Sequence, residues 1–294
     1  MLRHRIIALL IAALVGSGLA AVFMPAATAA TADACTSAPN WSAGTWYGTG
    51  NVVRYTDGKY YIAEHDNPGY DPLISTWYWD PYTCSGTPSG FVVSEAQFNQ
   101  MFPNRNSFYT YNGLKAALGA YPGFANTGSD TVKKQEAAAF LANVSHETGG
   151  LVHIVEQNQA NYPHYCDWSR PYGCPAGQAA YYGRGPIQLS WNFNYKAAGD
   201  ALGIDLLNNP WLVQNDAAVA WKTGLWYWNT QNGPGTMTPH NAMVNQAGFG
   251  QTIRSINGSL ECDGKNPAQV QSRVNNYTRF TQILGVPTGS NLYC

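Results

Sequence analysis

The sequence predicts a mainly α-helical domain that follows a small β-rich unit. From residue 91 to residue 294 the chain carries capped segments with helical periodicity and no strong β pattern. Residues 35–84 begin and end with cysteine and contain two β-rich runs. Residues 85–90, between these parts, read Ser-Gly-Thr-Pro-Ser-Gly, which is the composition of a flexible linker.

Residues 1–31 have the features of an export signal. A basic start precedes an almost entirely apolar run over residues 6–23, and Pro25 and small residues around Ala29 follow. The alternative is an uncleaved membrane anchor, because the run is nearly long enough to span a bilayer. Pro25 and the small residues favour cleavage, so we expect a secreted, extracellular protein with no membrane contact after signal removal.

The small unit, residues 35–84, is expected to hold a β-hairpin. Residues 52–55 and 59–63 are rich in Val, Ile and Tyr, and Thr56-Asp57-Gly58 between them predicts a tight turn. So short a unit buries little apolar surface, so we expect a covalent staple.

The six cysteines of the chain point to disulfides, because an even number in an exported protein is typical of them. Fifteen pairings are possible, and pairing within each sequence neighbourhood is the simplest. No C-x-x-C or H-x-x-x-H spacing occurs, so we predict neither a metal nor another cofactor. The expected pairs are Cys35–Cys84, Cys166–Cys174 and Cys262–Cys294.

The helices of the larger domain are predicted from caps and periodicity. Ser94 and Gln97 form a candidate capping box for a first helix. The clearest helix covers residues 131–148, with Asp130 as N-cap and Gly149-Gly150 as the stop. Three further helices are expected over residues 111–118, 215–229 and 268–284.

The composition indicates which class of ligand the protein could bind. Only 11% of residues are charged and the net charge is −1, so the chain lacks the basic footprint of a nucleic-acid-binding protein. The 10 Trp and 19 Tyr, together with many amides, suit an uncharged polyhydroxylated ligand. The alternative is an aromatic core in a stable secreted protein, and composition alone does not decide between them.

Glu147 continues the apolar stripe of the helix over residues 131–148, which includes Phe140 and Val144. Partial burial and the negative end of the helix both disfavour a carboxylate, so its pKa should be raised, as a general acid requires. The alternative is a glutamate paired with a buried arginine for structure. His146 begins a zinc signature with Glu147, but position 150 is Gly, so that interpretation fails.

Glu156 follows nine residues later in an amide-rich, uncharged setting. It suits a loop base that activates water, and an exposed loop glutamate is the alternative. Glycoside hydrolysis needs two such carboxyl groups. Downstream, residues 181–195 place neutral hydrogen-bonding side chains among aromatics, which is a sugar-binding surface in chemical terms.

Five blocks, in this order, resemble glycoside hydrolase family 19, the chitinases of plants and actinobacteria. The likeness covers about residues 91–294 and is to the compact bacterial type. It implies a lysozyme-like, two-lobed fold with a long cleft, and hydrolysis of β-1,4-linked N-acetylglucosamine polymers with inversion. The blocks are His146 to Gly150, Glu156, Tyr181 to Ser190, Ile256 to Cys262 and Ser272 to Val274.

The resemblance also implies roles for individual residues. Glu147 matches the general acid, Glu156 the general base and Ser190 the residue that positions the water. Glu261 and Arg273 match a charged network around the base, where an arginine would keep Glu156 ionised. The implied substrate contacts are His146, Tyr181, Gln188, Asn194 and Asn257.

The small unit resembles carbohydrate-binding modules of families 5 and 12, through Tyr47, Gly50, Val53, Tyr55 and the residues 58–63. The Trp-Trp pair that stacks on chitin in those modules is replaced by Glu64-His65. We expect a chitin-binding module over residues 35–84 whose aromatics are Tyr61, Trp77 and Trp79. The alternative is that these aromatics only pack the small core.

Together these features predict a secreted, monomeric endochitinase that acts on chitin or chitin oligomers. A peptidoglycan hydrolase is the first alternative, because the same carboxylate chemistry serves that polymer. A non-catalytic lectin is the second, but a lectin has no need of a paired acid and base.

Overall fold

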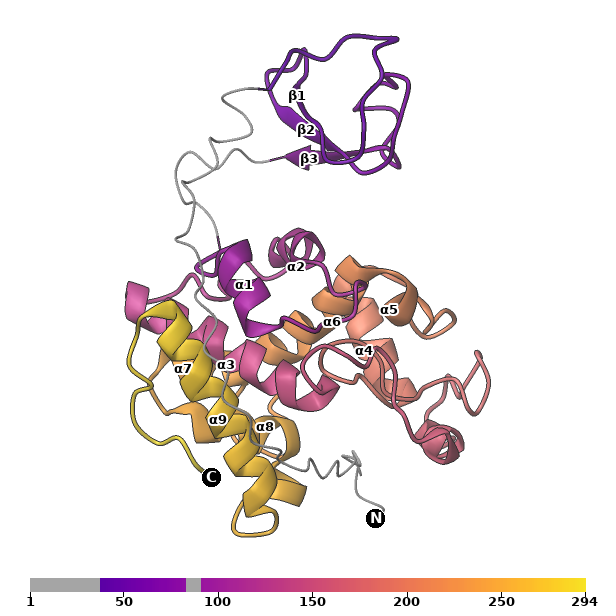
Figure 1. Ribbon diagram of the computed structural model, residues 1–294. Coiled ribbons are helices and arrows are strands. Elements are labelled where there is room, and N and C mark those ends of the chain that lie inside the picture. Colours follow the sequence, from indigo (N-terminus) through magenta and orange to yellow (C-terminus); the bar gives the residue numbers. More distant parts are fainter. Residues whose placement is uncertain (1–37, 83–90) are drawn as a thin grey trace, which may run out of the picture. The chain divides into compact units, whose positions relative to one another are not determined.

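The computed structural model describes residues 38–82 and 91–294, which belong to two separate compact units (Figure 1). The predicted signal, the linker and the pair Cys35–Cys84 lie outside the described residues. No helix in the described part of the chain is long and apolar enough to cross a membrane.

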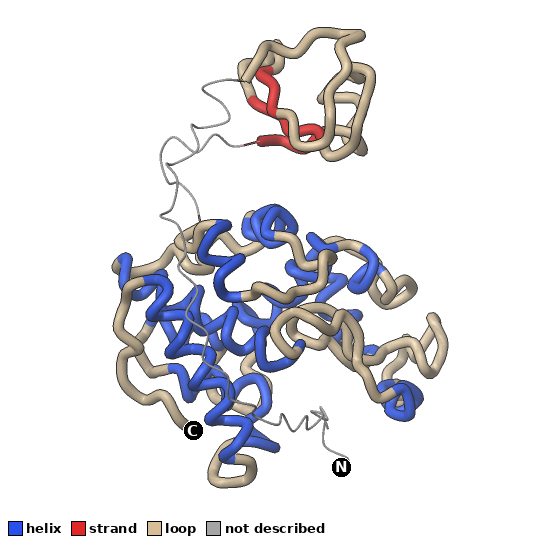
Figure 2. The backbone as a smooth tube through the Cα atoms, in the orientation of Figure 1, coloured by secondary structure: helices blue, strands red, loops and turns tan. Residues whose placement is uncertain are grey.

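The small unit contains a three-stranded antiparallel sheet of β1 (Val52–Arg54), β2 (Tyr60–Ala63) and β3 (Trp79–Tyr82), in that order (Figure 2). The predicted hairpin is confirmed, with Val53 opposite Tyr61. Gly58 closes its turn at φ 81°, and its N–H donates to the Tyr55 carbonyl at 3.0 Å. The third strand was not predicted, because Asp80 and Pro81 interrupt its β pattern.

The regular elements described in the larger unit are helices joined by long loops (Figure 2), so the mainly α fold class is confirmed. α3 packs against α9, α7 and α8, and α2 packs against α6 (Figure 1). The described elements of this unit are α1 (Glu95–Met101), α2 (Tyr111–Leu118), α3 (Asp130–Thr148), the 3-10 helix η1 (Gln159–Tyr165), α4 (Asn192–Leu202), α5 (Leu212–Asn215), α6 (Ala217–Thr230), α7 (Pro239–Val244), α8 (Phe249–Glu261) and α9 (Pro267–Leu284).

The helix ends follow local chemistry. The capping box of Ser94 and Gln97 is present. α3 begins one residue earlier than predicted, because the Ser129 hydroxyl accepts from the Val132 N–H at 3.3 Å and takes the N-cap role expected of Asp130. Gly149 ends α3 in the left-handed conformation at φ 63°.

α3 is the central helix, because residues 136–145 are buried on every side of it. The sequence pattern predicts a single apolar stripe on this helix, whereas the structure buries all of its faces over these residues. The Phe140 ring lies at the middle of α3 and contacts the rings of Phe124, Trp221 and Trp228, with centroids 5.1 to 6.1 Å away. A helix packed in this way holds its last turn rigidly, and that turn carries Glu147.

Two of the predicted disulfides, Cys166–Cys174 and Cys262–Cys294, are confirmed. The first closes the segment that follows η1. The second joins the residue after α8 to the chain end.

Candidate active site

Glu147 lies in the last turn of α3, and its side chain is 5% exposed. Its Oε1 accepts a hydrogen bond from Nη2 of Arg273 at 2.5 Å. Burial raises the pKa of Glu147, the charge of Arg273 opposes that rise, and the charge of Glu261 adds to it. The sequence pattern leaves a raised pKa and a buried arginine partner as alternatives for Glu147, and the structure shows both.

Arg273 also binds Glu261, from Nε to Oε2 and from Nη2 to Oε1, each at 2.7 Å. Its Nη1 donates to Oδ1 of Asn143, one turn before Glu147. Burial would raise the pKa of Glu261, but the hydrogen bonds and charge of Arg273 outweigh it and hold that pKa low. The prediction that this network surrounds Glu156 is wrong, because α9 packs along α3 and brings Arg273 to Glu147.

Two predicted substrate contacts lie in the same cluster. Asn257 stands where α8 departs from helical geometry, at φ −143° and ψ 26°, and its Nδ2 donates to Oε1 of Glu261 at 2.7 Å. His146 places Nδ1 3.1 Å from Oγ of Ser272. Burial, with the charge of Arg273, lowers the pKa of His146 to about 3, so its imidazole is neutral at ordinary pH.

Glu156 lies in the loop after α3, where all but one of its polar groups are bonded within the protein. Its N–H donates to the Gly183 carbonyl at 2.8 Å, and its carbonyl accepts from the Tyr162 hydroxyl at 2.9 Å. Oε1 accepts from Nδ2 of Asn161 at 2.7 Å and from the Tyr165 hydroxyl at 3.0 Å. Oε2 is buried and has no partner among the described residues.

The block downstream folds back onto the Glu156 loop. The backbone of Arg184 forms isolated antiparallel β-bridges with both Val155 and Leu189. The Gly185 N–H also donates to the Ile154 carbonyl at 2.8 Å. Gly183, whose carbonyl accepts from the Glu156 N–H, directly precedes Arg184. Both pairings of Arg184 therefore hold Gly183 in place.

Ser190, Gln188 and Asn194 lie beside this pairing. A Cβ at Gly183 would stand 3.3 Å from Oγ of Ser190 and 3.0 Å from Oε1 of Gln188, so only glycine fits there without displacement. Ser190 donates to the Gln188 carbonyl at 2.9 Å, and Asn194 donates to the Ser190 carbonyl at 2.9 Å. These three predicted site residues are thus brought together next to the loop of Glu156.

Tyr181 does not fit its predicted role as a substrate contact. Its side chain is completely buried, and its hydroxyl donates to the Leu207 carbonyl at 2.8 Å while accepting from the Ala176 N–H at 3.0 Å. Because the ring lies in the core and the hydroxyl is already bonded, Tyr181 supports the loops around the site and cannot reach a ligand.

Three residues that hydrogen-bond to Glu156 or to the arginine beside Glu147 were not predicted. Asn143 carries a signal in retrospect, since it is an amide inside an apolar helical stripe. Asn161 and Tyr165 stand in an aperiodic run rich in amides and aromatics, so nothing in the sequence marks them as facing Glu156.

The aromatics predicted for the small unit separate into two groups. Trp79 is 1% exposed and donates from Nε1 to the Tyr70 carbonyl, and Tyr61 is 4% exposed. Both pack the core of the unit, so the prediction that they contact chitin is wrong. Trp77 is 65% exposed and stacks on the His65 ring, with centroids 3.9 Å apart.

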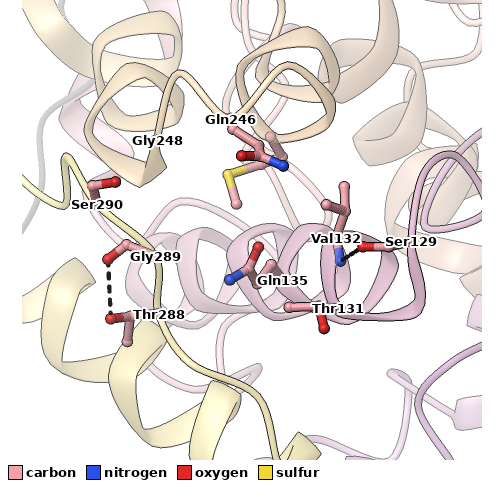
Figure 3. Close-up of a pocket in the computed structure, with 10 residues that line it drawn as sticks. Ser129, Thr131, Val132, Gln135, Gln246, Gly248, Thr288, Gly289 and Ser290 are labelled. Carbon is pink, nitrogen blue, oxygen red and sulfur yellow. Dashed lines mark hydrogen bonds between the residues drawn. The ribbon is translucent and has the colours of Figure 1, made fainter.

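A cavity of about 200 Å³ lies at the other end of α3 (Figure 3). Its lining is neutral, and it lies about 24 Å along the helix axis from Glu147. It contains none of the predicted site residues. The cavity is lined by Ser129, Thr131, Val132, Gln135, Met243, Gln246, Gly248, Thr288, Gly289 and Ser290.

Comparison with known proteins agrees with this geometry. The family described as class I chitinases, glycoside hydrolase family 19, matches residues 92–294. Endochitinase A of Zea mays is 46% identical over 210 residues, covering 69% of this chain and 71% of that protein.

Solved structures match the helical unit as well. The crystal structure of a bacterial family 19 chitinase is 84% identical, with a TM-score of 0.69, and covers 69% of this chain and all of that one. Chitinase C from Streptomyces griseus HUT6037 is 80% identical, with a TM-score of 0.70, and covers 71% of this chain and all of that one. The chain is a glycoside hydrolase with the lysozyme-like fold of these enzymes, and it belongs to the class I chitinases of family 19.

Proposed function

We propose that this chain cleaves β-1,4 bonds between N-acetylglucosamine units of chitin with inversion of the anomeric centre. In this proposal Glu147 is the general acid, Glu156 is the general base and Ser190 positions the water. One observation carries the assignment: the two carboxyl groups have opposite environments. Glu147 is buried with a raised pKa, whereas Glu156 accepts two hydrogen bonds on one oxygen.

The environment of Glu147 suits proton donation. Burial and the C-terminal end of α3 both favour the protonated carboxyl group in the resting enzyme. Once the proton passes to the glycosidic oxygen, the carboxylate that forms is already bonded to Arg273. The cationic Arg273 binds a carboxylate more strongly than a neutral carboxyl group, so this hydrogen bond strengthens during the transfer and favours the transition state over the ground state.

The environment of Glu156 suits a base. Oε2 accepts a proton from a water, the water oxygen bonds to the anomeric carbon from the opposite face, and the glycosidic C–O bond breaks. The leaving oxygen takes the proton from Glu147, so the charges balance. Inversion requires the two carboxyl groups to stand about 6.5–9.5 Å apart, which leaves room for that water.

The test is a time course of N-acetylglucosamine oligomer hydrolysis followed by anomer-resolving proton NMR. The first product should be the α-anomer. Glu147→Gln and Glu156→Gln should each lower kcat by about 10²–10⁴-fold with oligomer binding retained. Glu95→Gln, at an exposed glutamate in the first turn of α1, is the matched control.

Two results would contradict the proposal. Early β-anomer would exclude inversion, and near-normal turnover by Glu147→Gln would remove that residue from the mechanism. Clearing of purified bacterial walls without release of chitin oligomers would favour a peptidoglycan hydrolase. Tight oligomer binding with no turnover in the parent enzyme would favour a lectin.

The rest of the chain belongs to the same proposal. Residues 1–31 direct secretion, residues 35–84 bind chitin, and the mature enzyme acts as an extracellular monomer. Exposed Trp77 supports chitin binding, because a solvent-facing indole offers a flat surface to a sugar ring. His65 stacks beneath it at the position where related modules carry an aromatic pair.

A further inference from the structure

We infer that Asn161 and Tyr165 are positioning residues that fix Glu156 so that Oε2 is the atom that accepts the proton from water. This inference rests on the proposed role of Glu156 as the general base. It adds two residues and one specific oxygen atom to that role.

The hydrogen bonds around Glu156 distinguish its two carboxyl oxygens. Oε1 has two donors, Nδ2 of Asn161 at 2.7 Å and the Tyr165 hydroxyl at 3.0 Å. Oε2 is buried but has no donor among the described residues. The carboxyl group cannot rotate to exchange its oxygens without breaking both bonds to Oε1, so the two oxygens stay distinct.

The unpartnered oxygen is the one suited to bind water. A buried carboxylate oxygen without a donor loses free energy on desolvation, and a water that donates to it restores the balance. Oε1, already shared by two donors, is the weaker acceptor for a further proton. A water bonded to Oε2 is therefore oriented with its proton toward the base and its lone pairs away from it.

The backbone of Glu156 is fixed independently of its side chain. Its N–H donates to the Gly183 carbonyl, and its carbonyl accepts from the Tyr162 hydroxyl. The Tyr162 ring stacks on Tyr182 with centroids 3.7 Å apart, and the Arg184 guanidinium lies 3.6 Å from the Tyr182 centroid. Loss of a donor to Oε1 should therefore release the carboxyl group without displacing the backbone.

Both donors come from η1, which is anchored at each end. The Asn158 side chain accepts from the Ala160 N–H at its start, and Cys166, bonded to Cys174, follows Tyr165 directly. Tyr165 is 4% exposed and meets Trp191 edge to face at 5.7 Å. The positioning residues are thus rigid relative to the loop of Glu156.

The experiment compares Asn161→Ala, Asn161→Asp and Tyr165→Phe in the full chain, using chitin oligomers. We expect kcat to fall about 10- to 100-fold for Asn161→Ala and Tyr165→Phe, with KM changed by less than about threefold. A role in stability alone would not produce this split between kcat and KM. Asn161→Asp should lower kcat further, since it replaces a donor with a second carboxylate against Oε1.

Tyr111→Phe is the matched control, because it removes a hydroxyl that donates to the Val93 carbonyl at 2.7 Å in a partly buried setting elsewhere. It should leave both kcat and KM unchanged. Thermal unfolding of each variant separates misfolding from loss of positioning. If Asn161→Ala does not fold, Tyr165→Phe alone still decides.

The outcomes distinguish positioning by Asn161 and Tyr165 from the role of Glu156 as the base. If Glu156→Gln is inactive while Asn161→Ala and Tyr165→Phe keep parental kcat, positioning by these residues is excluded and the base assignment survives. If Glu156→Gln turns over normally, the base assignment itself is wrong.

Discussion

Arg273 and Glu147 are joined by a hydrogen bond between buried side chains, 1% and 5% exposed, and the same guanidinium also binds Glu261. Two carboxyl groups therefore share one cation, and only one of them can be fully neutralised by it. Burial raises the pKa of Glu147, whereas the two hydrogen bonds and the charge of Arg273 outweigh burial at Glu261 and lower its pKa. Of the two carboxyl groups, Glu147 is therefore the one that more readily takes a proton.

Replacing Glu261 should alter the pH range of activity. Glu261→Gln removes a negative charge that raises the pKa of Glu147 and leaves Arg273 to Glu147 alone. In the proposed mechanism activity requires protonated Glu147, so activity is lost as pH rises through that pKa. We expect the basic limb of the kcat/KM profile to move to lower pH by about one unit.

The control for this variant is Asp263→Asn, which removes a nearby carboxylate that binds Arg254 on the surface at 2.8 Å. Its basic limb should stay at the parental pH. A basic limb that does not move in Glu261→Gln would mean that the charge of Glu261 does not reach Glu147.

His240 should make folding stability depend on pH. Its Nδ1 lies 2.6 Å from Oε1 of buried Glu136, and this hydrogen bond raises the pKa of His240 despite the opposing effect of burial. Protonated His240 therefore favours the folded state below its unfolded pKa of about 6.5, and this contribution is lost as pH rises through the raised value.

Urea unfolding of the parent and of His240→Gln across pH 5 to 9 measures the effect. The difference in unfolding free energy should be about 1.5–3 kcal/mol at pH 5 and should shrink toward pH 9. A difference that is constant across this range would show that protonation of His240 does not contribute.

The two described disulfides should have different consequences. Cys262–Cys294 closes a longer loop, of 32 residues against 8, so its removal by paired alanines should cost more stability, about 3–4 kcal/mol against about 2–3 kcal/mol. Cys166–Cys174 follows Tyr165, so its removal should lower kcat more. Denaturant unfolding and oligomer kinetics, measured on both variants, test whether the disulfide that matters more for stability is the one that matters less for kcat.

Trp77→Ala should weaken adsorption to insoluble chitin by about tenfold while leaving hydrolysis of soluble oligomers unchanged, because Trp77 is exposed in a separate unit. Trp46→Ala, at another exposed indole of this unit, tests whether any surface Trp suffices. Equal adsorption by Trp77→Ala and the parent would exclude this site.

The fold was predictable where its determinants are local. Ser94 with Gln97, the turn at Gly58 and the stop at Gly149 each act within a few residues, so the sequence carries them. α8 was missed because its kink at Asn257 and its glycines obscure the helical period.

The site was predictable less completely, for reasons of tertiary packing. Arg273 lies 126 residues from Glu147, and nothing near it in sequence says which glutamate it binds. Tyr181 and Tyr182 are adjacent tyrosines, yet one is wholly buried and the other stacks on Tyr162. Burial separates such neighbours, and burial depends on which helices meet.

α3 carries a second buried carboxyl group, Glu136, which accepts from the Trp228 Nε1–H and from the Ala125 N–H, both at 3.0 Å. Glu136 and Glu147 lie three turns apart, about 16 Å along one rigid rod. A slide of α3 along its own axis would break the contacts of both at once. The axial register of the helix is therefore fixed at two points, so packing around Glu136 also sets the position of Glu147.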